Sequence, residues 1–297
     1  MTRRKAVLIA NPKTGRYNSR RTQVGELLSY LQSLGIDVEL RSTAGPGDAC
    51  EIAAQAARNR TSDVIVAGGD GTINEAIQGL AGTDARLAII PRGTGNVLAR
   101  ELGVPLDPME AARLIANGKT KKIFLGVAID EASNKNRYFM LMAGIGLDAS
   151  VVLRVQPALK KRIGKLAFWY SGLSQLASWN ISSFSLEVEG KTYDTTFAAI
   201  GKAAKYGGDL AITPRARLDQ PEFEICVFET SSRRRYLRLL SQAMREGLSE
   251  NSQGVRFLKS QKVRATGDVP VQVDGEVIGN LPMIFEIAPH SLEVIVP

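Results

Sequence analysis

The chain has 297 residues, of which 44% are hydrophobic and 23% are charged, and its formal net charge is +8. This composition excludes a disordered or collagen-like chain, and the length predicts one large or two modest domains. No apolar run in the sequence reaches the roughly 18 to 20 residues that a membrane span needs. The two cysteines, Cys50 and Cys226, and the lone His290 argue against a zinc site or a His-based triad, and the positive charge favours an anionic partner.

The first 120 or so residues alternate strand-like and helix-like patterns. Helical spacing of Leu27, Leu28 and Leu31 ends at Gly35, a helix stop signal. Strands separated by helices predict a parallel sheet covered on both faces, which binds ligands at the carboxyl ends of its strands. The predicted strands are residues 5–10, 36–40, 63–67 and 87–90.

After residue 120 one strand-like segment follows another with few helices between them. This change predicts a second, mainly antiparallel β-sandwich domain. We expect two helices in it, at residues 157–179 and 232–248. The predicted strands are residues 122–129, 138–143, 183–189, 195–201, 223–228, 269–274, 283–287 and 292–296.

The strongest functional signal is the segment Gly68-Gly69-Asp70-Gly71-Thr72-Ile73-Asn74-Glu75, which follows an apolar strand and opens a helix. Its glycines let the backbone approach a phosphate group, and a helix N-terminus favours an anion. An aspartate among such donors makes sense if it holds Mg²⁺ or a sugar hydroxyl. An ordinary strand–helix turn with an N-cap is the alternative, but the full Gly-Gly-Asp-Gly-Thr string favours a nucleotide site.

Two more loops follow predicted strands and carry Gly, Thr or Asn together with a cation. They are Asn11-Pro12-Lys13-Thr14-Gly15-Arg16 and Pro91-Arg92-Gly93-Thr94-Gly95-Asn96. Each alone is typical of an ordinary turn. Three such loops at one edge of a sheet point to a triphosphate.

The three loops together resemble the diacylglycerol kinase catalytic-domain family, the soluble bacterial lipid kinases related to sphingosine and ceramide kinases. The resemblance implies an NAD-kinase-like α/β domain and a β-sandwich domain with the active site between them. We place these domains at residues 1–121 and 122–290, with a final strand at about 291–297 that returns to the first domain. Further matching segments are residues 43–49, 99–100, 143–149, 164–168 and 273–276.

The resemblance also assigns residues to roles. It implies Asp274 as the catalytic aspartate with Glu276 as its acidic neighbour, Arg100 near the phosphates, and Lys165 at the cleft. Asp70 and Glu276 would share the catalytic Mg²⁺. The residues implied to bind ATP are Asn11, Pro12, Lys13, Thr43, Gly68, Gly69, Asp70, Gly71, Thr72, Asn74, Glu75, Thr94 and Asn96.

From the residues alone, Asp274-Gly275 indicates a hairpin turn rather than a catalytic site, and only the resemblance reverses this. Two departures from the family pattern also matter. Val97 stands where many members have aspartate. Asp219 and Gln220 stand where many bacterial members have the Asp-Asp-Gly loop of a structural Mg²⁺, which argues against a structural metal here.

The stretch from Ala149 to Leu186 contains basic and aromatic residues but no acidic residue. A helix of this kind either lies on an anionic bilayer or packs on the core with its basic face in solvent. A second basic cluster, Arg233 to Arg235 with Arg238, is typical of a solvated helix start.

These observations predict an ATP-dependent, Mg²⁺-requiring lipid kinase that phosphorylates a lipid hydroxyl, diacylglycerol before others. A sphingoid, glycerol-type or polyprenol acceptor, an NAD kinase-like activity, and a non-catalytic nucleotide- or lipid-binding regulator are the alternatives. We expect a cytoplasmic protein, peripheral at the inner membrane face, with a lipid substrate and no nucleic-acid partner. The sequence leaves open whether the chain forms a homodimer.

Overall fold

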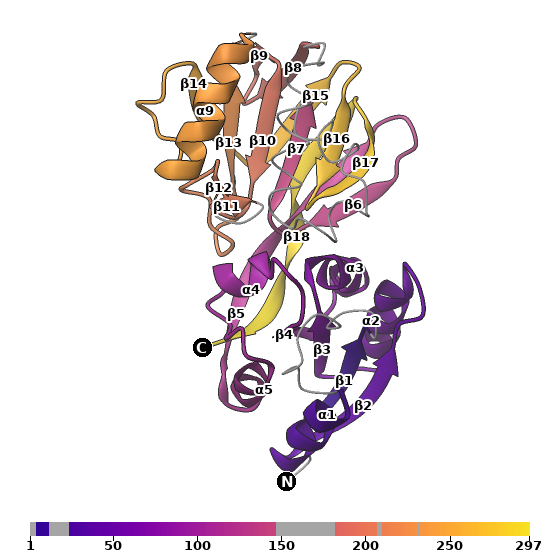
Figure 1. Cartoon of the computed structure of the whole chain (residues 1–297). Coiled ribbons are helices and arrows are strands. Elements are labelled where there is room, and N and C mark those ends of the chain that lie inside the picture. The colour runs from indigo at the N-terminus through magenta and orange to yellow at the C-terminus, as the bar shows by residue number, and fades with distance from the viewer. Residues whose placement is uncertain (1–3, 12–23, 147–181, 207–209, 231) are drawn as a thin grey trace. The chain divides into compact units, whose positions relative to one another are not determined.

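The computed structural model describes residues 4–11, 24–146, 182–206, 210–230 and 232–297 (Figure 1). The chain divides into two compact units. Unit 1 comprises Met1–Leu125 and Ala288–Pro297, and unit 2 comprises Gly126–Ile287. The predicted helix at 157–179 lies outside the described residues.

Unit 1 contains a parallel sheet, as the alternating pattern predicts. Its inner strands are apolar and almost wholly buried, because helices cover both faces of the sheet, whereas the edge strand at residues 36–42 is partly exposed. Strand β3 (Asp63–Gly68) pairs in parallel with β1 (Arg4–Ala10) on one side and with β4 (Arg86–Pro91) on the other. The order across the sheet is β2 (Ile36–Ser42), β1 (Arg4–Ala10), β3 (Asp63–Gly68), β4 (Arg86–Pro91) and the end of β18 (Met283–Val296).

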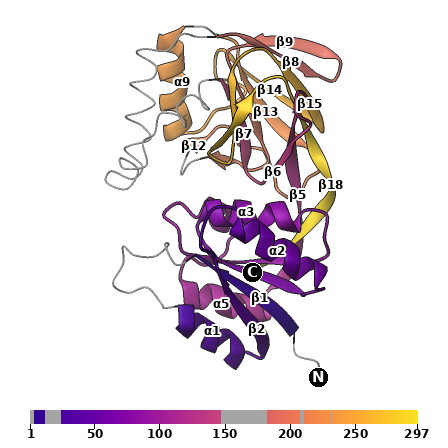
Figure 2. The same cartoon turned by 90° about the vertical axis from the view of Figure 1, so that its right-hand side faces the viewer.

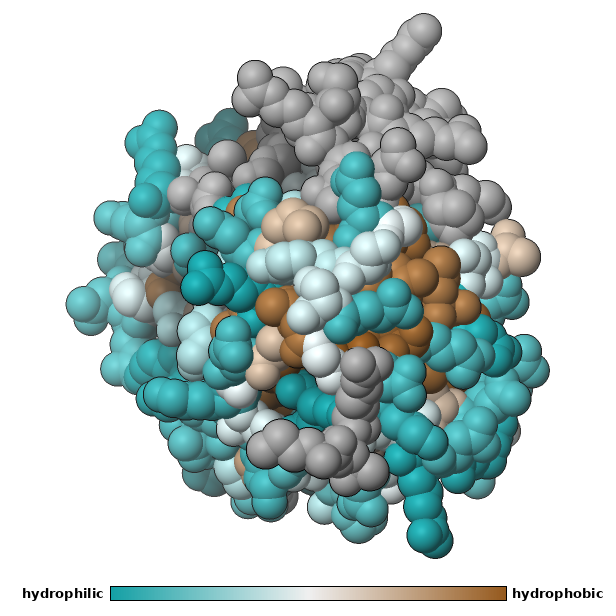
Figure 3. All heavy atoms as spheres, turned by 90° about the horizontal axis from the view of Figure 1, so that it is seen from below, coloured by the Kyte–Doolittle hydropathy of each residue, from teal (hydrophilic) through white to brown (hydrophobic). Residues whose placement is uncertain are grey.

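Four helices form the two outer layers of unit 1 (Figure 2). Helices α2 (Asp48–Arg58) and α3 (Asp70–Leu80) pack together on one face, and α1 (Val24–Ser33) packs with α5 (Pro108–Asn117) on the other. The short helix α4 (Val97–Glu101) follows β4. In the space-filling view of Figure 3, polar side chains surround an apolar area near the centre of the face shown.

Unit 2 is the predicted β-sandwich. Its first sheet is antiparallel throughout, and its second sheet includes the first part of β18, which therefore serves both units. The first sheet runs β14 (Val255–Ser260), β13 (Phe223–Phe228), β10 (Phe197–Gly201), β7 (Met142–Gly146), β16 (Pro270–Val273) and β17 (Glu276–Asn280). The second comprises β15 (Lys262–Thr266), β8 (Phe184–Val188), β9 (Lys191–Thr195), β5 (Lys119–Asp130) and β6 (Asn136–Phe139) with β18, and β11 (Lys205–Tyr206) pairs with β12 (Leu210–Ala211).

Apolar side chains from both sheets form the sandwich core, where the rings of Phe139 and Phe223 stack with centroids 5.8 Å apart. Helix α9 (Arg233–Arg245) packs on the outside of the first sheet through Tyr236, whose ring centroid lies 5.3 Å from that of Phe228. Strands β10 and β13 are therefore buried on both faces, which explains why their sequences are apolar apart from Glu224.

Two predicted strand boundaries were wrong. The segment 138–143 is two strands rather than one, because the backbone N–H groups of Met140 and Leu141 donate to the Asp274 carboxylate instead of to a neighbouring strand. The predicted strands at 283–287 and 292–296 are one continuous strand, β18.

Among the described helices, none combines the length and hydropathy needed to cross a bilayer.

Asp63 joins two arginines at the amino end of the unit 1 sheet. Its side chain is fully buried, and it accepts hydrogen bonds from Arg4 and from Arg86 Nε at 2.8 Å. We expect Asp63→Asn to lower the free energy of unfolding by about 3 kcal/mol, because it leaves two partly buried guanidinium groups without their anion. Urea denaturation measures this. The exposed Asp84→Asn is the control, and an unchanged midpoint for Asp63→Asn would contradict the prediction.

Candidate active site

The loops that follow the strands of unit 1 converge at the carboxyl edge of its sheet. The N–H of Thr43 donates to the carbonyl of Ala10 at 3.0 Å, and the N–H of Arg92 donates to the carbonyl of Gly68 at 2.8 Å. The side chain of Asn11 donates to Thr72 Oγ1 at 3.3 Å. Residues after all four parallel strands therefore meet at one edge, as the loop pattern predicts.

The two glycine loops touch each other at Gly69 and Gly93. A Cβ atom built on Gly93 would lie 2.6 Å from the Cα of Gly69 and 2.9 Å from Oδ1 of Asn96, and one built on Gly69 would lie 3.1 Å from the Cα of Gly93. Only glycine permits so close an approach of two backbones. The glycines thus fix the relative positions of the β3 and β4 loops.

Asn96 holds the second of these loops in shape. It has a positive φ of 49°, and its side chain is bonded at both ends to Gly93, accepting from its N–H at 2.8 Å and donating to its carbonyl at 3.0 Å. Both the oxygen and the nitrogen of the Asn96 side-chain amide thus form hydrogen bonds within the loop. Thr94, which lies between Gly93 and Asn96 in sequence, is exposed, and Gly71 in the first glycine loop is also exposed.

Asp70 is half-buried where the two loops meet α4. Its Oδ1 accepts from the N–H of Leu98 at 3.3 Å, and a Cβ on Gly95 would lie 3.0 Å from its Oδ2. Burial raises the pKa of Asp70, and backbone N–H groups at the start of α4 oppose that shift. A nearby cation would favour the ionised carboxylate.

The fit to Mg²⁺ follows from the donors present. Mg²⁺ is usually bound by one or two carboxylates together with phosphate oxygens of the substrate, and Asp70 supplies one such carboxylate. Within the described part of the chain, no three His, Cys, Asp or Glu side chains cluster as an all-protein metal site. The residues therefore fit a metal that arrives with a nucleotide.

Other predicted nucleotide-binding residues also support the loops. Thr72 packs against Gly68, where a Cβ would lie 2.8 Å from the Thr72 Cβ. Glu75 accepts from the N–H of Gly47 at 3.1 Å, which ties α3 to the loop after β2. Asn74 is buried, and its carbonyl accepts from Gln78.

Arg100 is exposed on α4, and its Nε donates to the carbonyl of Gly95 at 3.2 Å. The guanidinium group is therefore attached to the second glycine loop. Pro12, Lys13 and Lys165 lie outside the described residues.

Asp274 belongs to unit 2 and lies in the predicted Asp-Gly hairpin turn. Asp274 and Gly275 have φ values of 48° and 85° between the paired residues Val273 and Glu276, as a two-residue type I′ turn requires. The Asp274 carboxylate accepts three backbone N–H groups, from Met140, Leu141 and Met142, at 2.8 to 3.0 Å. It therefore joins the β16–β17 hairpin to the start of β7, whatever further role it has.

The two other acidic residues considered as metal ligands, Glu276 and Asp219, already pair with arginines. Glu276 is mostly exposed and pairs with Arg137 at 2.5 Å. Both carboxylate oxygens of Asp219 accept hydrogen bonds from Arg217, each at 2.9 Å.

The sequence analysis missed Lys202, which is fully buried. The only signal for it in the sequence is its position directly after a wholly apolar strand.

Comparison with known proteins agrees with this architecture. Residues 5–128 match the diacylglycerol kinase catalytic domain, and residues 142–296 match the YegS C-terminal NAD kinase beta sandwich-like domain. The chain is 29% identical to a diacylglycerol kinase of Bacillus subtilis, covering 99% of this chain and 97% of that protein. It is 30% identical to a diacylglycerol kinase of Mycobacterium tuberculosis, with 99% and 95% covered.

Solved structures show the same fold. A Bacillus anthracis diacylglycerol kinase structure superposes with a TM-score of 0.75 at 22% identity, covering 99% of this chain and 97% of that one. Another solved chain from that organism gives a TM-score of 0.81 at 24% identity, with 100% and 98% covered. The two domain matches and the full-length relatives together place this chain in the diacylglycerol kinase catalytic-domain family.

Proposed function

We propose that this protein is an ATP-dependent lipid kinase that transfers the γ-phosphate of ATP to a lipid hydroxyl, with diacylglycerol as the first candidate acceptor. The observation that carries the proposal is the contact between the Gly69 and Gly93 loops beside Asp70. This arrangement offers backbone N–H groups and a helix N-terminus to phosphate oxygens and a carboxylate to their metal. Membership of the family supports the kinase activity itself.

In this proposal, the phosphates, their charge and their metal are each assigned to residues of unit 1. The glycine loops and the N-terminus of α3 bind the phosphates, and Arg100 neutralises charge on the group in transfer. Asp70 would hold Mg²⁺, which supplies positive charge beside the phosphate oxygens when it is bound. The protein otherwise contributes alignment, because phosphoryl transfer needs little covalent help.

In the proposed reaction, the acceptor oxygen forms a bond to the γ-phosphorus while the bond from that phosphorus to the β,γ-bridging oxygen breaks. ADP leaves with the bridging oxygen, and the hydroxyl proton passes to a carboxylate. Asp274 is the candidate acceptor of that proton, because it matches the catalytic aspartate of the family and a carboxylate can take the proton of an attacking hydroxyl.

The kinase assay uses ATP labelled at the γ-phosphate and mixed micelles that each contain one lipid: diacylglycerol, a sphingoid base, a glycerol-type lipid or a polyprenol. We expect label in phosphatidic acid. Label in a different lipid would change the acceptor, label only in added NAD would contradict the lipid kinase proposal, and no label with retained nucleotide binding would favour a regulator.

Asp274→Asn is expected to reduce turnover at least about a hundredfold, the usual size of a lost general base. Because Asn would also present an NH₂ group to backbone donors, its thermal unfolding must be measured beside its activity. The exposed Asp268→Asn is the matched control in the same unit. If Asp274→Asn is less stable but turns over normally per folded molecule, the residue has only the structural role.

Gly93→Ala is expected to weaken ATP binding at least about tenfold, because the new methyl group would push the Gly69 loop away. Titration with a fluorescent nucleotide measures this. Gly25→Ala on α1 is the control, since a Cβ there meets nothing within 4 Å. Unchanged affinity in Gly93→Ala would mean that the loop contact does not shape the nucleotide site.

We further propose that the exposed face of α9 binds the anionic membrane that contains the lipid substrate. Arg234, Arg235 and Arg238 are exposed on this face together with Leu237, which is 42% exposed. The first turn of α9 has no acidic residue, and Ser232 makes no capping side-chain bond. Arginines are unfavourable at a helix N-terminus, so helix stability does not explain them, whereas attraction to anionic lipid does.

The double variant Arg234→Glu with Arg235→Glu is expected to bind anionic vesicles several-fold more weakly in sedimentation, although its α9 gains a favourable interaction with the helix dipole. Its thermal stability should therefore not fall, which separates lost binding from lost folding. Arg58→Glu with Arg113→Glu is the control of equal charge change on exposed helices of unit 1. Equal sedimentation of the two double variants would contradict the assignment of α9.

A further inference from the structure

Lys202 lies at the end of β10 with its whole side chain buried. A buried ammonium group is costly unless each of its donors has a partner. Here Nζ donates to the backbone carbonyls of Arg217 and Glu222, each at 3.1 Å, and also to that of Gln220. Three N–H donors meet three carbonyl acceptors, so the charge is fully hydrogen-bonded.

These three carbonyls belong to one irregular segment, residues 213–222, which we call the carbonyl loop. The loop begins against the same strand end as Lys202: a Cβ on Gly201 would lie 2.1 Å from Thr213 Oγ1, and that hydroxyl donates to the carbonyl of Ala203 at 2.9 Å. The backbone N–H of Lys202 donates to the carbonyl of Leu141 at 2.8 Å. The strand therefore fixes where the ammonium sits before the loop closes around it.

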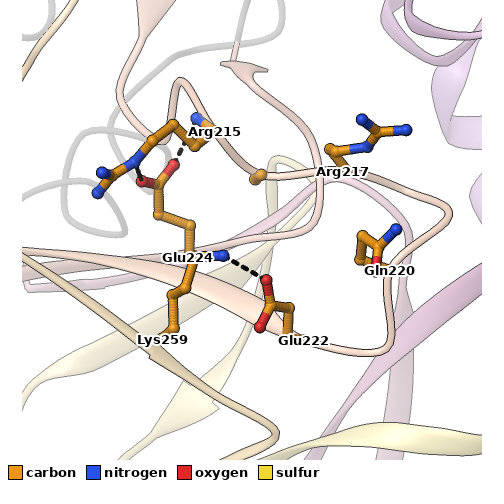
Figure 4. Close-up of a pocket in the computed structure, with 7 residues that line it drawn as sticks. Arg215, Arg217, Gln220, Glu222, Glu224 and Lys259 are labelled. Carbon is orange, nitrogen blue, oxygen red and sulfur yellow. Dashed lines mark hydrogen bonds and ion pairs between the residues drawn. The ribbon is translucent and has the colours of Figure 1, made fainter.

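The outer side of the carbonyl loop lines a pocket of about 260 Å³. In this pocket Arg215 pairs with Glu224, and Lys259 pairs with Glu222 (Figure 4). The pairs are made by side chains, of which Arg215 and Lys259 are largely exposed and Glu224 is buried, whereas the carbonyls that face Lys202 belong to the backbone of the carbonyl loop. The loop thus lies between an internal cation and a surface of paired charges.

This loop is where the family resemblance leads one to expect a structural divalent cation, and its residues do not fit one. Such a cation takes carboxylate oxygens among its ligands. Position 220 is glutamine, and both oxygens of Asp219 accept from Arg217. The three carbonyls that point inward already surround a positive charge, so a divalent ion would meet both a steric and an electrostatic conflict.

We propose that the ammonium group of Lys202 is a built-in cation that takes the place of a structural metal ion and holds the carbonyl loop closed. Burial lowers the pKa of Lys202 to about 8, which leaves the amine protonated at neutral pH. The loop is therefore expected to keep its structure without any divalent ion. This inference does not depend on the kinase proposal, because it concerns the architecture of unit 2 alone.

The experiment is hydrogen exchange on the full chain, read at the backbone amides of the carbonyl loop. In the wild-type protein, we expect the same protection in EDTA and in excess Mg²⁺ or Ca²⁺. Lys202→Met removes the charge but keeps most of the side-chain volume. It should lower protection of the loop at least about tenfold, as expected for a lost hydrogen bond to a charged group.

Lys202→Ala tests whether the carbonyls form a true cation site. Its shorter side chain leaves room for a small ammonium ion, so methylammonium should restore protection in Lys202→Ala but not in Lys202→Met. Lys259→Met is the matched control, because Lys259 is a mostly exposed lysine beside the same loop. It should leave protection within a few-fold of wild type.

Three results would overturn the proposal. Loss of wild-type loop protection in EDTA would show that a metal holds the loop. Wild-type protection in Lys202→Met would show that the ammonium does not. If methylammonium does not restore protection of the carbonyl loop in Lys202→Ala, the carbonyls are not a cation site. The first result needs no variant, so the proposal can fail even if both substitutions prevent folding.

Discussion

The close approach of two backbones, at Gly69 and Gly93, is the constraint on which the candidate nucleotide site depends. Parallel strands place their carboxyl ends at one edge of a sheet, but the loops beyond them are free to diverge. The absence of two side chains lets the β3 and β4 loops touch. That contact places Asp70 beside the first N–H groups of α4, and it orders Asn96 around Gly93. A single methyl group there would separate elements that sequence patterns alone treat as independent.

Patterns of short range predicted most of the fold. Alternating apolar runs and helical spacing gave the parallel sheet of unit 1, because each element there buries its own face against the next. The Asp274-Gly275 turn was also readable, since positive φ at two successive residues favours that residue pair. The glycine strings predicted that several loops share one edge of the sheet. All of these signals concern residues that are neighbours in sequence or in one layer.

Contacts between distant segments were not readable in the same way. The strand predicted at 138–143 breaks because Asp274, more than 130 positions away, accepts its backbone N–H groups. Lys202 resembles any surface lysine in the sequence, and only the folded chain brings the carbonyls of a later loop around it. The single strand β18 was predicted as two, because exposed residues interrupt its apolar pattern. Such features arise from tertiary partners, which a local pattern does not contain.

The Lys202 contacts and the Asp274 contacts share one physical principle. In each, a charged side chain satisfies three backbone groups that a regular strand would otherwise pair. Backbone groups that are buried outside regular structure need such partners. Unit 2 therefore uses one anion and one cation to stabilise irregular segments beside its sheets, and each charge is retained because of the backbone groups that surround it.

Strand β18 gives the chain an order of assembly during synthesis. Its first part pairs with β15 in unit 2, and its last residues pair with β4 in unit 1. Four strands of the unit 1 sheet leave the ribosome early, but the fifth follows only after every residue of unit 2 has been made. Until then the edge of β4 lacks its partner strand, so the sheet of unit 1 can be completed only after the whole of unit 2 has been synthesised.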